Sequence, residues 1–276
     1  MADRKSHSKS SNTFELTKWY LDCTTQEKQV VIYYAALLRW GKRKLHYNSL
    51  ILSEQGQNTL QKSRFWKGIL PDVHQDLIHL KDPVLRIDGH WRSATESFGT
   101  RLVDEEDGYL DWTCLQPDSD VNLNIAGKIY TGHGYSEKLI MTIPAWKINM
   151  KELRWGRFQS GTESMVWIDL DGSNKHLWIN GTETSEFKCA DGEIRDESAF
   201  YHLQMTPYRV IESEKKIETV VKKAGRFIPG FKDSIPSSFL QADATKWYSS
   251  GVLQKRNAQP IHGYVIHEFV NFNPME

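Results

Sequence analysis

Apolar and polar residues alternate along most of this chain, in short stretches bounded by clusters of Gly, Asp, Asn and Ser. An alternation with a period of two places apolar side chains on one face of an extended strand, whereas a helix repeats them every three to four residues. The pattern therefore predicts that strands dominate the fold. The segments expected as strands are 19–23, 29–39, 45–52, 84–87, 109–115, 121–125, 128–143, 164–170, 176–179, 200–211, 216–222, 246–255 and 260–272.

Pairs of Asp or Asn followed by Gly separate several of these segments. Such pairs accept the positive φ angles of tight hairpin turns, so neighbouring strands are expected to run antiparallel. Helices are expected only over 71–80 and 149–155, and both are short. The predicted fold class is all-β, as an antiparallel meander, sandwich or barrel. The turn pairs are Asp88-Gly89, Asp107-Gly108, Asp171-Gly172, Asn180-Gly181 and Asp191-Gly192.

The chain has 276 residues, a length that favours two domains. Residues 144–157 interrupt the alternation with Pro, Lys and Arg close to the midpoint, which indicates a boundary there. We therefore expect one unit over 13–145 and a second over 146–276. Residues 1–12 contain serine and basic residues without apolar anchors and are expected to form a disordered tail.

Basic and acidic residues balance at 35 each, so the formal net charge is zero. A nucleic-acid partner is not expected, because such proteins carry net positive charge or a basic stripe. No apolar run approaches the roughly 18 residues that span a bilayer, and no signal-peptide core follows Met1. A cytoplasmic location is therefore expected. The three cysteines are far apart in the sequence and are expected to be reduced, buried thiols.

Aromatic residues make up 12% of the chain, including 10 Trp. This much aromatic surface has to be buried in cores or around an apolar ligand. Signatures of cofactors and metals are weak by comparison. Gly132-x-Gly134 lacks the third glycine of a dinucleotide site, residues 169–174 lack the terminal Glu of a calcium loop, and His262 and His267 lack a third histidine. Neither a cofactor nor a metal is therefore expected.

The expected strand over 128–143 carries polar side chains on its more apolar face. Alternation places His133, Tyr135 and Glu137 together on that face. The glycines on either side of His133 indicate a bulge or the close approach of another backbone. A bulge would change which residues share a face beyond it, so the grouping depends on this point.

Glu137 is the candidate general acid of this face. Burial disfavours the ionised form of a carboxyl group, so a carboxyl group on an apolar face can hold and deliver a proton. Tyr135 would orient a substrate or water, and His133 would accept or relay a proton. Two structural alternatives remain open: Glu137 pairs with Arg154 or Arg157 at the end of a barrel, and His133 is an interior histidine with satisfied hydrogen bonds.

Several motifs together resemble the AttH-like and carotenoid hydratase (hydroxyneurosporene synthase) superfamily. They cover much of the chain from about residue 109 onward, whereas residues 1–100 match only loosely. The matching stretches are Trp112-Thr-Cys-Leu-Gln-Pro117, Gly132-His-Gly-Tyr-Ser-Glu-Lys-Leu139, Thr142-Ile-Pro-Ala-Trp-Lys147, Glu152-Leu-Arg-Trp-Gly-Arg-Phe158 and Gly263-Tyr-Val-Ile-His-Glu268.

The resemblance implies two tandem lipocalin-like antiparallel β-barrels with few short helices. In the hydratase branch it implies cofactor-independent addition of water to an isoprenoid double bond, with a substrate-facing tyrosine and a proton-donating aspartate. These roles fall on Tyr135 and, with Glu in place of Asp, on Glu137, while Trp112 matches a nearby tryptophan. Leu110 stands where the hydratase pattern has a histidine, so the likeness is closer to the AttH-like branch.

Two functions of different classes follow. The first is a hydratase-like lyase, cyclase or isomerase in which Glu137 protonates an isoprenoid or lipid-like metabolite in an apolar pocket. Protonating an alkene creates a carbocation, so Tyr135, Trp112 and Trp155 are expected to line a cation-stabilising site, with His133 as a further substrate-binding residue. The second is a carrier that binds a hydrophobic small molecule without altering it. The sequence indicates neither the ligand nor the oligomeric state.

Overall fold

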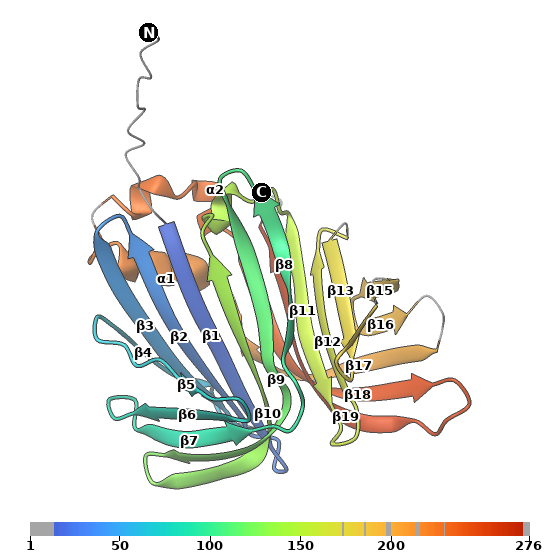
Figure 1. The fold of residues 1–276 in the computed structure, drawn as a ribbon. Coiled ribbons are helices and arrows are strands. Elements are labelled where there is room, and N and C mark those ends of the chain that lie inside the picture. Colours follow the sequence, from blue (N-terminus) through green and yellow to red (C-terminus); the bar gives the residue numbers. More distant parts are fainter. Residues whose placement is uncertain are drawn as a thin grey trace.

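The computed structural model describes residues 14–272, apart from 173, 185, 197–199, 214–215 and 229. Two large sheets make up most of this part of the chain and lie side by side (Figure 1). Neighbouring strands in both sheets run antiparallel. The all-β, antiparallel fold class predicted from the alternation is therefore confirmed. The tail expected over 1–12 lies outside the described residues.

The first sheet has ten strands in the described part of the chain, in the order β4-β3-β2-β1-β10-β9-β7-β6-β5, with β8 paired to β9. Because β1 pairs with β10, the beginning of this segment meets its end and the sheet curls into a barrel-like unit. Its strands are β1 (Phe14–Thr25), β2 (Val30–Trp40), β3 (Arg43–Ser53), β4 (Leu60–Phe65), β5 (Asp72–Val73), β6 (Leu77–Asp82), β7 (Ile87–Arg92), β8 (Phe98–Glu105), β9 (Gly108–Ile125) and β10 (Lys128–Met141).

The second sheet repeats this plan with nine strands among the described residues, in the order β14-β13-β12-β11-β19-β18-β17-β16-β15. Here β11 pairs with β19, again joining the start of the segment to its end. Its strands are β11 (Glu152–Gln159), β12 (Ser164–Leu170), β13 (Asn174–Ile179), β14 (Thr182–Thr184), β15 (Phe187–Ala190), β16 (Glu193–Asp196), β17 (Tyr201–Glu212), β18 (Asp243–Lys255) and β19 (Ile261–Asn271). The tandem of barrel-like units implied by the resemblance is what the structure shows.

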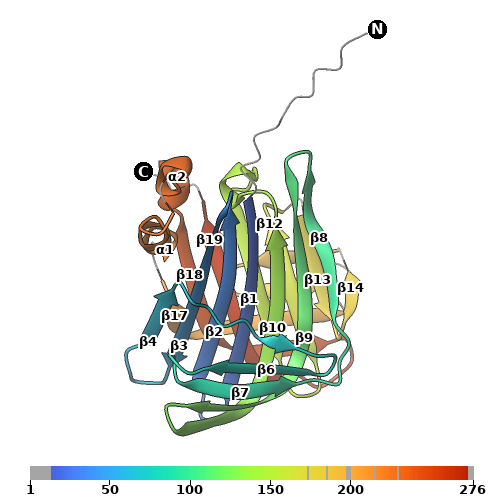
Figure 2. The same ribbon diagram turned by 60° about the vertical axis from the view of Figure 1, so that its left-hand side comes forward.

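Helical segments are short. The 3-10 helix η1 (Ala145–Lys147) lies between the sheets in sequence, and α1 (Lys216–Ala224), η2 (Lys232–Ser234) and α2 (Ser237–Leu240) connect β17 to β18. Although this connection belongs to the second sheet, Val221 and Ile228 pack with Leu38 of β2 and Leu45 of β3 in the first. Figures 1 and 2 both show α1 and α2 at one end of the sheets.

Alternation along β1 divides its side chains between two cores. Trp19, Leu21 and Cys23 belong to a core that the first sheet encloses alone. Tyr20, on the opposite face, belongs to a core shared by both sheets, to which Trp155 of β11 also contributes. The two sheets therefore pack through one face of each, and polar groups on those faces lie between the sheets.

Four segments differ from their predicted structure. The strand predicted over 84–87 is mostly the turn between β6 and β7, and only Ile87 belongs to β7. The other three segments are determined by tertiary contacts. Residues 216–222, predicted as a strand from their Ile, Thr and Val, form α1, because Val221 and Ala224 lie on one side of a helix and pack on the first sheet. Residues 71–80, predicted as a helix, form β5 and the start of β6, which buries every second residue. Residues 149–155, also predicted as a helix, include the start of β11, which pairs on both sides. Tertiary pairing and packing override local propensity in each case.

Most of the predicted Asp-Gly and Asn-Gly turns join strands. Asp171 and Asn180 have φ angles of 57° and 51°, the left-handed values found in tight hairpin connections. Asp88-Gly89 instead lies within β7, where a Cβ on Gly89 would be 2.4 Å from the carbonyl oxygen of Asn122. The pairs found at hairpin connections are Asp107-Gly108, Asp171-Gly172, Asn180-Gly181 and Asp191-Gly192.

The glycines of β10 mark a close approach of β1, and β10 itself carries no bulge against β1. A Cβ on Gly134 would be 2.2 Å from the carbonyl oxygen of Asp22 and 2.5 Å from Cγ2 of Val121. We expect Gly134→Ala to lower the free energy of unfolding by about 1–3 kcal/mol, because the added methyl group forces the strands apart. Denaturant unfolding measures this change. An unaltered unfolding midpoint would show that the strands are not held so closely.

Within the described residues, no helix has the length and apolarity to cross a bilayer. The chain passes from the first sheet to the second between Met141 and Glu152. The division into domains over 13–145 and 146–276 stays a prediction.

Candidate functional site

The carboxyl group of Glu137 accepts three hydrogen bonds on one oxygen. The Trp112 indole donates to Oε2 over 2.6 Å, the Tyr135 hydroxyl over 2.8 Å and the Trp155 indole over 3.0 Å. All are residues that the sequence singled out, and the structure brings them together at one atom. Among the described residues no hydrogen bond reaches the other oxygen, Oε1, so that oxygen is available to exchange a proton with water or a ligand.

Both sheets supply this cluster. Trp112 lies on β9, Tyr135 and Glu137 lie on β10, and Trp155 lies on β11 of the second sheet. Glu137 is opposite Cys114 in the pairing of β10 with β9. Trp112, two residues further along β9, is therefore a diagonal neighbour on the same face. The site thus spans the contact between the two sheets.

A bulge in β9 adjusts the register beside the site. From Gly134 to Glu137 the chain of β10 advances three residues, while the paired positions on β9 run five residues, from Ser119 to Cys114. Pro117 lies within this stretch and has no N–H to donate to a ladder hydrogen bond. Bulges re-aim side chains next to functional sites, and here the bulge sets Cys114 opposite Glu137.

Aromatic rings enclose the Glu137 carboxyl group, which remains partly exposed. Tyr135 is fully buried, and Trp112 and Trp155 are 2% and 7% exposed. The ring centre of Tyr20 lies 5.2 Å from that of Trp155 and 6.1 Å from that of Tyr135. Burial, reinforced by the Glu137 charge, raises the pKa of Tyr135 well above its usual value. Its hydroxyl therefore keeps its proton and remains a hydrogen-bond donor.

A buried lysine lies against the same rings. Lys246 of β18 is 2% exposed, and its Nζ lies 4.7 Å from the ring centre of Trp155 and 5.2 Å from that of Tyr20. The ammonium also donates to Oε2 of Glu268 over 2.7 Å. The face of Trp155 thus holds a cation while the N–H at its edge binds Glu137.

Lys246 was not among the residues predicted from the sequence, although the chain carries a signal for it. Ala244, Lys246 and Tyr248 alternate along β18 and are all buried. A lysine between two apolar residues at this spacing indicates a charged group that faces the interior. Tyr20 was also missed, and it lies directly opposite Glu137 in the pairing of β1 with β10.

The predicted alternative in which Glu137 pairs with Arg154 or Arg157 is wrong. Arg157 pairs with Asp22 of β1, with Nη2 2.6 Å from Oδ1 and Nε 3.0 Å from Oδ2. Arg154 pairs instead with Asp191 near the surface. The donors to Glu137 are therefore neutral groups, and a separate buried ion pair joins the two sheets nearby.

His133 lies apart from the cluster, although it is on the same face of β10. Its side chain is 54% exposed, with Nδ1 3.5 Å from Oδ1 of Asp118, so the interior-histidine alternative is wrong. The hydrogen bond that His133 donates to the Asp118 carboxylate raises the pKa of His133. His133 and Arg157 both line a pocket of about 480 Å³ between β1, β10, β11 and β19. The substrate-binding role predicted for His133 could only be exercised from that pocket.

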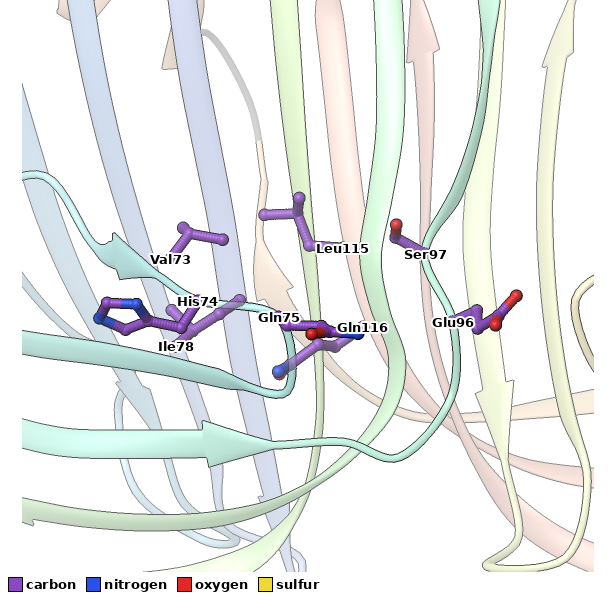
Figure 3. A pocket seen from close by; sticks show the side chains of 8 residues that line it. All are labelled: Val73, His74, Gln75, Ile78, Glu96, Ser97, Leu115 and Gln116. Atoms are coloured by element: carbon purple, nitrogen blue, oxygen red, sulfur yellow. The ribbon is translucent and has the colours of Figure 1, made fainter.

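A second pocket, of about 340 Å³, lies on another part of the first sheet (Figure 3). Neither of these two pockets is lined by Trp112 or Tyr135. Both side chains belong instead to the core shared by the two sheets. The expected common environment is present, but it is a packed aromatic core and not one of these pockets. The residues lining the second pocket are Val73, His74, Gln75, Ile78, Glu96, Ser97, Leu115 and Gln116.

No family model matches the sequence, and no curated protein matches it in sequence. Solved structures, however, match it in fold. CghA superposes with a TM-score of 0.57 at 10% identity, covering 95% of this chain and 90% of that chain. CghA has also been solved with Sch210972.

Two further structures match over most of their length. Kievitone hydratase from Nectria haematococca gives a TM-score of 0.53 at 10% identity, over 94% of this chain and 89% of that chain. NE1406 from Nitrosomonas europaea, described as an AttH, gives a TM-score of 0.53 at 9% identity, over 92% of both chains. Likeness at this level of identity concerns the fold. The chain thus shares the fold of the AttH, CghA and kievitone hydratase structures, as its resemblance to the AttH-like and carotenoid hydratase superfamily implies.

Proposed function

We propose that this protein is an enzyme in which Glu137 acts as an acid on a hydrophobic small molecule, promoting hydration, cyclisation or isomerisation. The observation that carries the proposal is the convergence of three donors on Oε2 of this one carboxyl group. A structural carboxylate at an interior contact is ordinarily paired with a cation, as Asp22 is with Arg157. Glu137 is instead held by two indoles and a phenol, and Oε1 is left for chemistry.

The proposed step begins with a proton on Oε1 of Glu137. The proton passes to one carbon of a substrate double bond, and the negative charge left on the carboxylate is stabilised at Oε2 by its three donors. Because the donors are in place before the reaction, they need no reorganisation as the charge develops. Water or another group of the substrate then adds to the adjacent carbon. Loss of a proton to Glu137 completes the addition and restores the acid.

The electrostatics of the cluster indicate where a carbocation would form. The Lys246 ammonium already occupies the face of Trp155. With an effective dielectric constant of about 20, two like charges about 5 Å apart repel by about 3 kcal/mol. We therefore place the developing cation beside Trp112 and Tyr135. The role of Trp155 becomes that of holding Glu137, in place of the cation-lining role predicted for it.

Two fold neighbours support this proposal, one named a hydratase and one solved with Sch210972. Proton transfer from a carboxyl group and addition of water require no redox group, so we propose that the reaction proceeds without a cofactor. The aromatic surroundings of Glu137 suit an apolar, isoprenoid or lipid-like substrate. A cytoplasmic location remains a prediction.

The proposal is tested with an organic extract of cells that produce the protein. Wild-type protein incubated with the extract should consume one hydrophobic compound and yield a product heavier by one water, or an isomer of the same mass. Mass spectrometry of the extract before and after incubation detects either product. A compound that is bound and recovered unchanged would overturn the enzymatic proposal and establish the carrier instead.

A further inference from the structure

Two large aromatic side chains are exposed next to each other where the α1 connection meets the first sheet. Trp66, directly after β4, is 63% exposed, and Phe227, just after α1, is 38% exposed. Their ring centres are 6.0 Å apart. The Arg43 side chain donates a hydrogen bond to the carbonyl oxygen of Phe227 over 3.2 Å. This hydrogen bond joins the start of β3, next to the β2–β3 turn, to the segment that follows α1.

The backbone of Trp66 is strained. Its φ angle is 96°, in the left-handed region that disfavours a bulky side chain. The surroundings hold it there: the Trp66 amide donates to the carbonyl oxygen of His46 over 3.1 Å, and a Cβ on Gly68 would be 2.3 Å from Cβ of His46. Strain of this kind costs free energy, persists only where the surroundings hold it and clusters at functional sites. In this conformation Trp66 is 63% exposed.

Six exposed basic residues lie on the three segments that meet at the two rings, namely the turn into β3, the residue after Trp66 and the residues before Phe227. None of them forms a salt bridge with a described carboxylate, whereas Lys222 of α1 is paired with Glu218. The chain as a whole is neutral, so this is a local excess of positive charge, with exposed Asp233 as a nearby acidic residue in the same connection. The aromatic–basic patch consists of Trp66 and Phe227 with the exposed Lys42, Arg43, Lys44, Lys67, Lys223 and Arg226.

We propose that the aromatic–basic patch docks this protein on an anionic lipid bilayer. Indole and phenyl rings insert at the boundary between headgroups and acyl chains, and lysine and arginine are attracted to anionic headgroups. Two rings alone bind a bilayer weakly, and cations beside them add the attraction that holds the protein there. The patch is formed by the first sheet and the α1 connection, away from the cluster around Glu137, so this proposal does not depend on the chemistry of that site.

The arrangement favours a bilayer over a single-stranded nucleic acid. Nucleic-acid sites of that kind align several rings along a basic groove that follows the strand. Here the exposed rings are one adjacent pair, and neither described pocket is lined by them. A pair of exposed aromatic side chains with basic residues on the same segments suits a lipid headgroup surface, because only the two rings have to enter the apolar layer.

Vesicle sedimentation tests the proposal. The full chain should bind vesicles of phosphatidylcholine with phosphatidylglycerol, bind vesicles of phosphatidylcholine alone much more weakly, and be released from the anionic vesicles as the salt concentration is raised. Removing both rings in Trp66→Ala with Phe227→Ala should lower the partition coefficient by about tenfold or more. Neutralising two cations in Lys42→Gln with Lys44→Gln should lower it by about tenfold or more on the anionic vesicles.

Matched variants separate docking from general effects. Val84→Ala with Ile129→Ala removes exposed apolar side chains elsewhere and should leave binding unchanged. Lys151→Gln with Lys188→Gln makes the same change in net charge away from the patch and should have little effect.

A glycine variant separates docking from folding. Trp66→Gly should have the wild-type melting temperature or a higher one, because glycine adopts a positive φ without strain. It should nevertheless bind anionic vesicles more weakly than the wild type, because it lacks the indole ring. The proposal is overturned if the wild-type protein does not bind anionic vesicles. It is also overturned if the double variant Trp66→Ala with Phe227→Ala binds them as well as the wild type does. Stronger binding to single-stranded RNA than to vesicles, lost in the same variants, overturns it as well.

Discussion

Replacing Arg157 by methionine should lower the free energy of unfolding by about 3–5 kcal/mol. The guanidinium is 1% exposed and Asp22, its partner, is fully buried, so the change leaves a carboxylate in the interior without its counter-ion. Arg157 also donates to Oε1 of Gln159 over 2.7 Å. Because the ion pair joins β1 of the first sheet to β11 of the second, the variant should also lose cooperativity between the sheets. Urea unfolding followed by tryptophan fluorescence measures both effects.

The pH dependence of this variant has a definite sign. Burial already raises the pKa of Asp22, although Arg157 opposes the shift. Without Arg157 the pKa of Asp22 in the folded state rises further above its value in the unfolded state. The stability of the variant is therefore greatest below the unfolded-state pKa of Asp22 and is lost as the pH rises through the folded-state pKa. The gap in stability between wild type and Arg157→Met should therefore narrow towards acidic pH. A gap that widens there would contradict the assignment of the buried charge.

A surface pair provides the control for this experiment. Arg154 is paired with Asp191, whose side chain is 89% exposed. Arg154→Met should cost less than about 1 kcal/mol, because exposed ion pairs are screened by solvent. Adding Asp22→Asn to Arg157→Met should restore part of the lost stability, since no buried charge then remains. Equal losses in the Arg154 and Arg157 variants would show that the Asp22 pair is not a buried one.

Glu137→Gln should reduce turnover by a factor of about 100 or more, because glutamine cannot deliver a proton. Its carbonyl oxygen can still accept the hydrogen bonds that Trp112, Tyr135 and Trp155 donate to Oε2. The unfolding midpoint should therefore change little, and binding of the substrate should persist. The assay follows the compound consumed from the cell extract, on the same preparation used for unfolding.

Glu152→Gln is the matched control, because it removes a carboxylate that is 47% exposed and lies on the strand next to the site. This variant should retain wild-type turnover. Normal turnover in Glu137→Gln would remove Glu137 from the chemistry and leave its three donors without a catalytic explanation.

The alternation of residues predicted which side chains of β10 share a face. Tyr135 and Glu137 do lie together, because the pairing of β10 with β1 is regular, and the register shift against β9 does not disturb it. The resemblance added Trp112 to this pair. What alternation cannot show is how far along the face each residue lies. His133 therefore shares the face but remains exposed near the pocket, away from the aromatic cluster.

Contacts between the two sheets were beyond the reach of local patterns. Arg157 and Asp22 are 135 positions apart, and the alternation of residues gives no reason to prefer Asp22 over Glu137 as the partner of Arg157. Lys246 similarly reaches Tyr20 and Trp155 only because the second sheet packs on the first. These residues are distant in sequence, so only the packing of the sheets brings their charges to the site.

Errors in secondary structure have the same origin. Residues 216–222 carry the β-branched side chains of a strand, but Val221 and Ala224 find their partners on another sheet and the segment forms α1. The short strands β4 and β5 were missed because they are largely exposed and lack an apolar face. Local propensity identifies a fold class, whereas the ends and edges of its sheets depend on tertiary contacts.

The most direct test of the account is the transfer of solvent deuterium to carbon. Wild-type protein and Glu137→Gln are incubated with the cell extract in heavy water, and the product is analysed by mass spectrometry after exchangeable deuterium has been washed back to hydrogen. If Glu137 protonates a double bond, the wild-type product carries carbon-bound deuterium and the Glu137→Gln sample contains almost none. Deuterium incorporated equally by both proteins, or a wild-type product formed without any, would contradict the account.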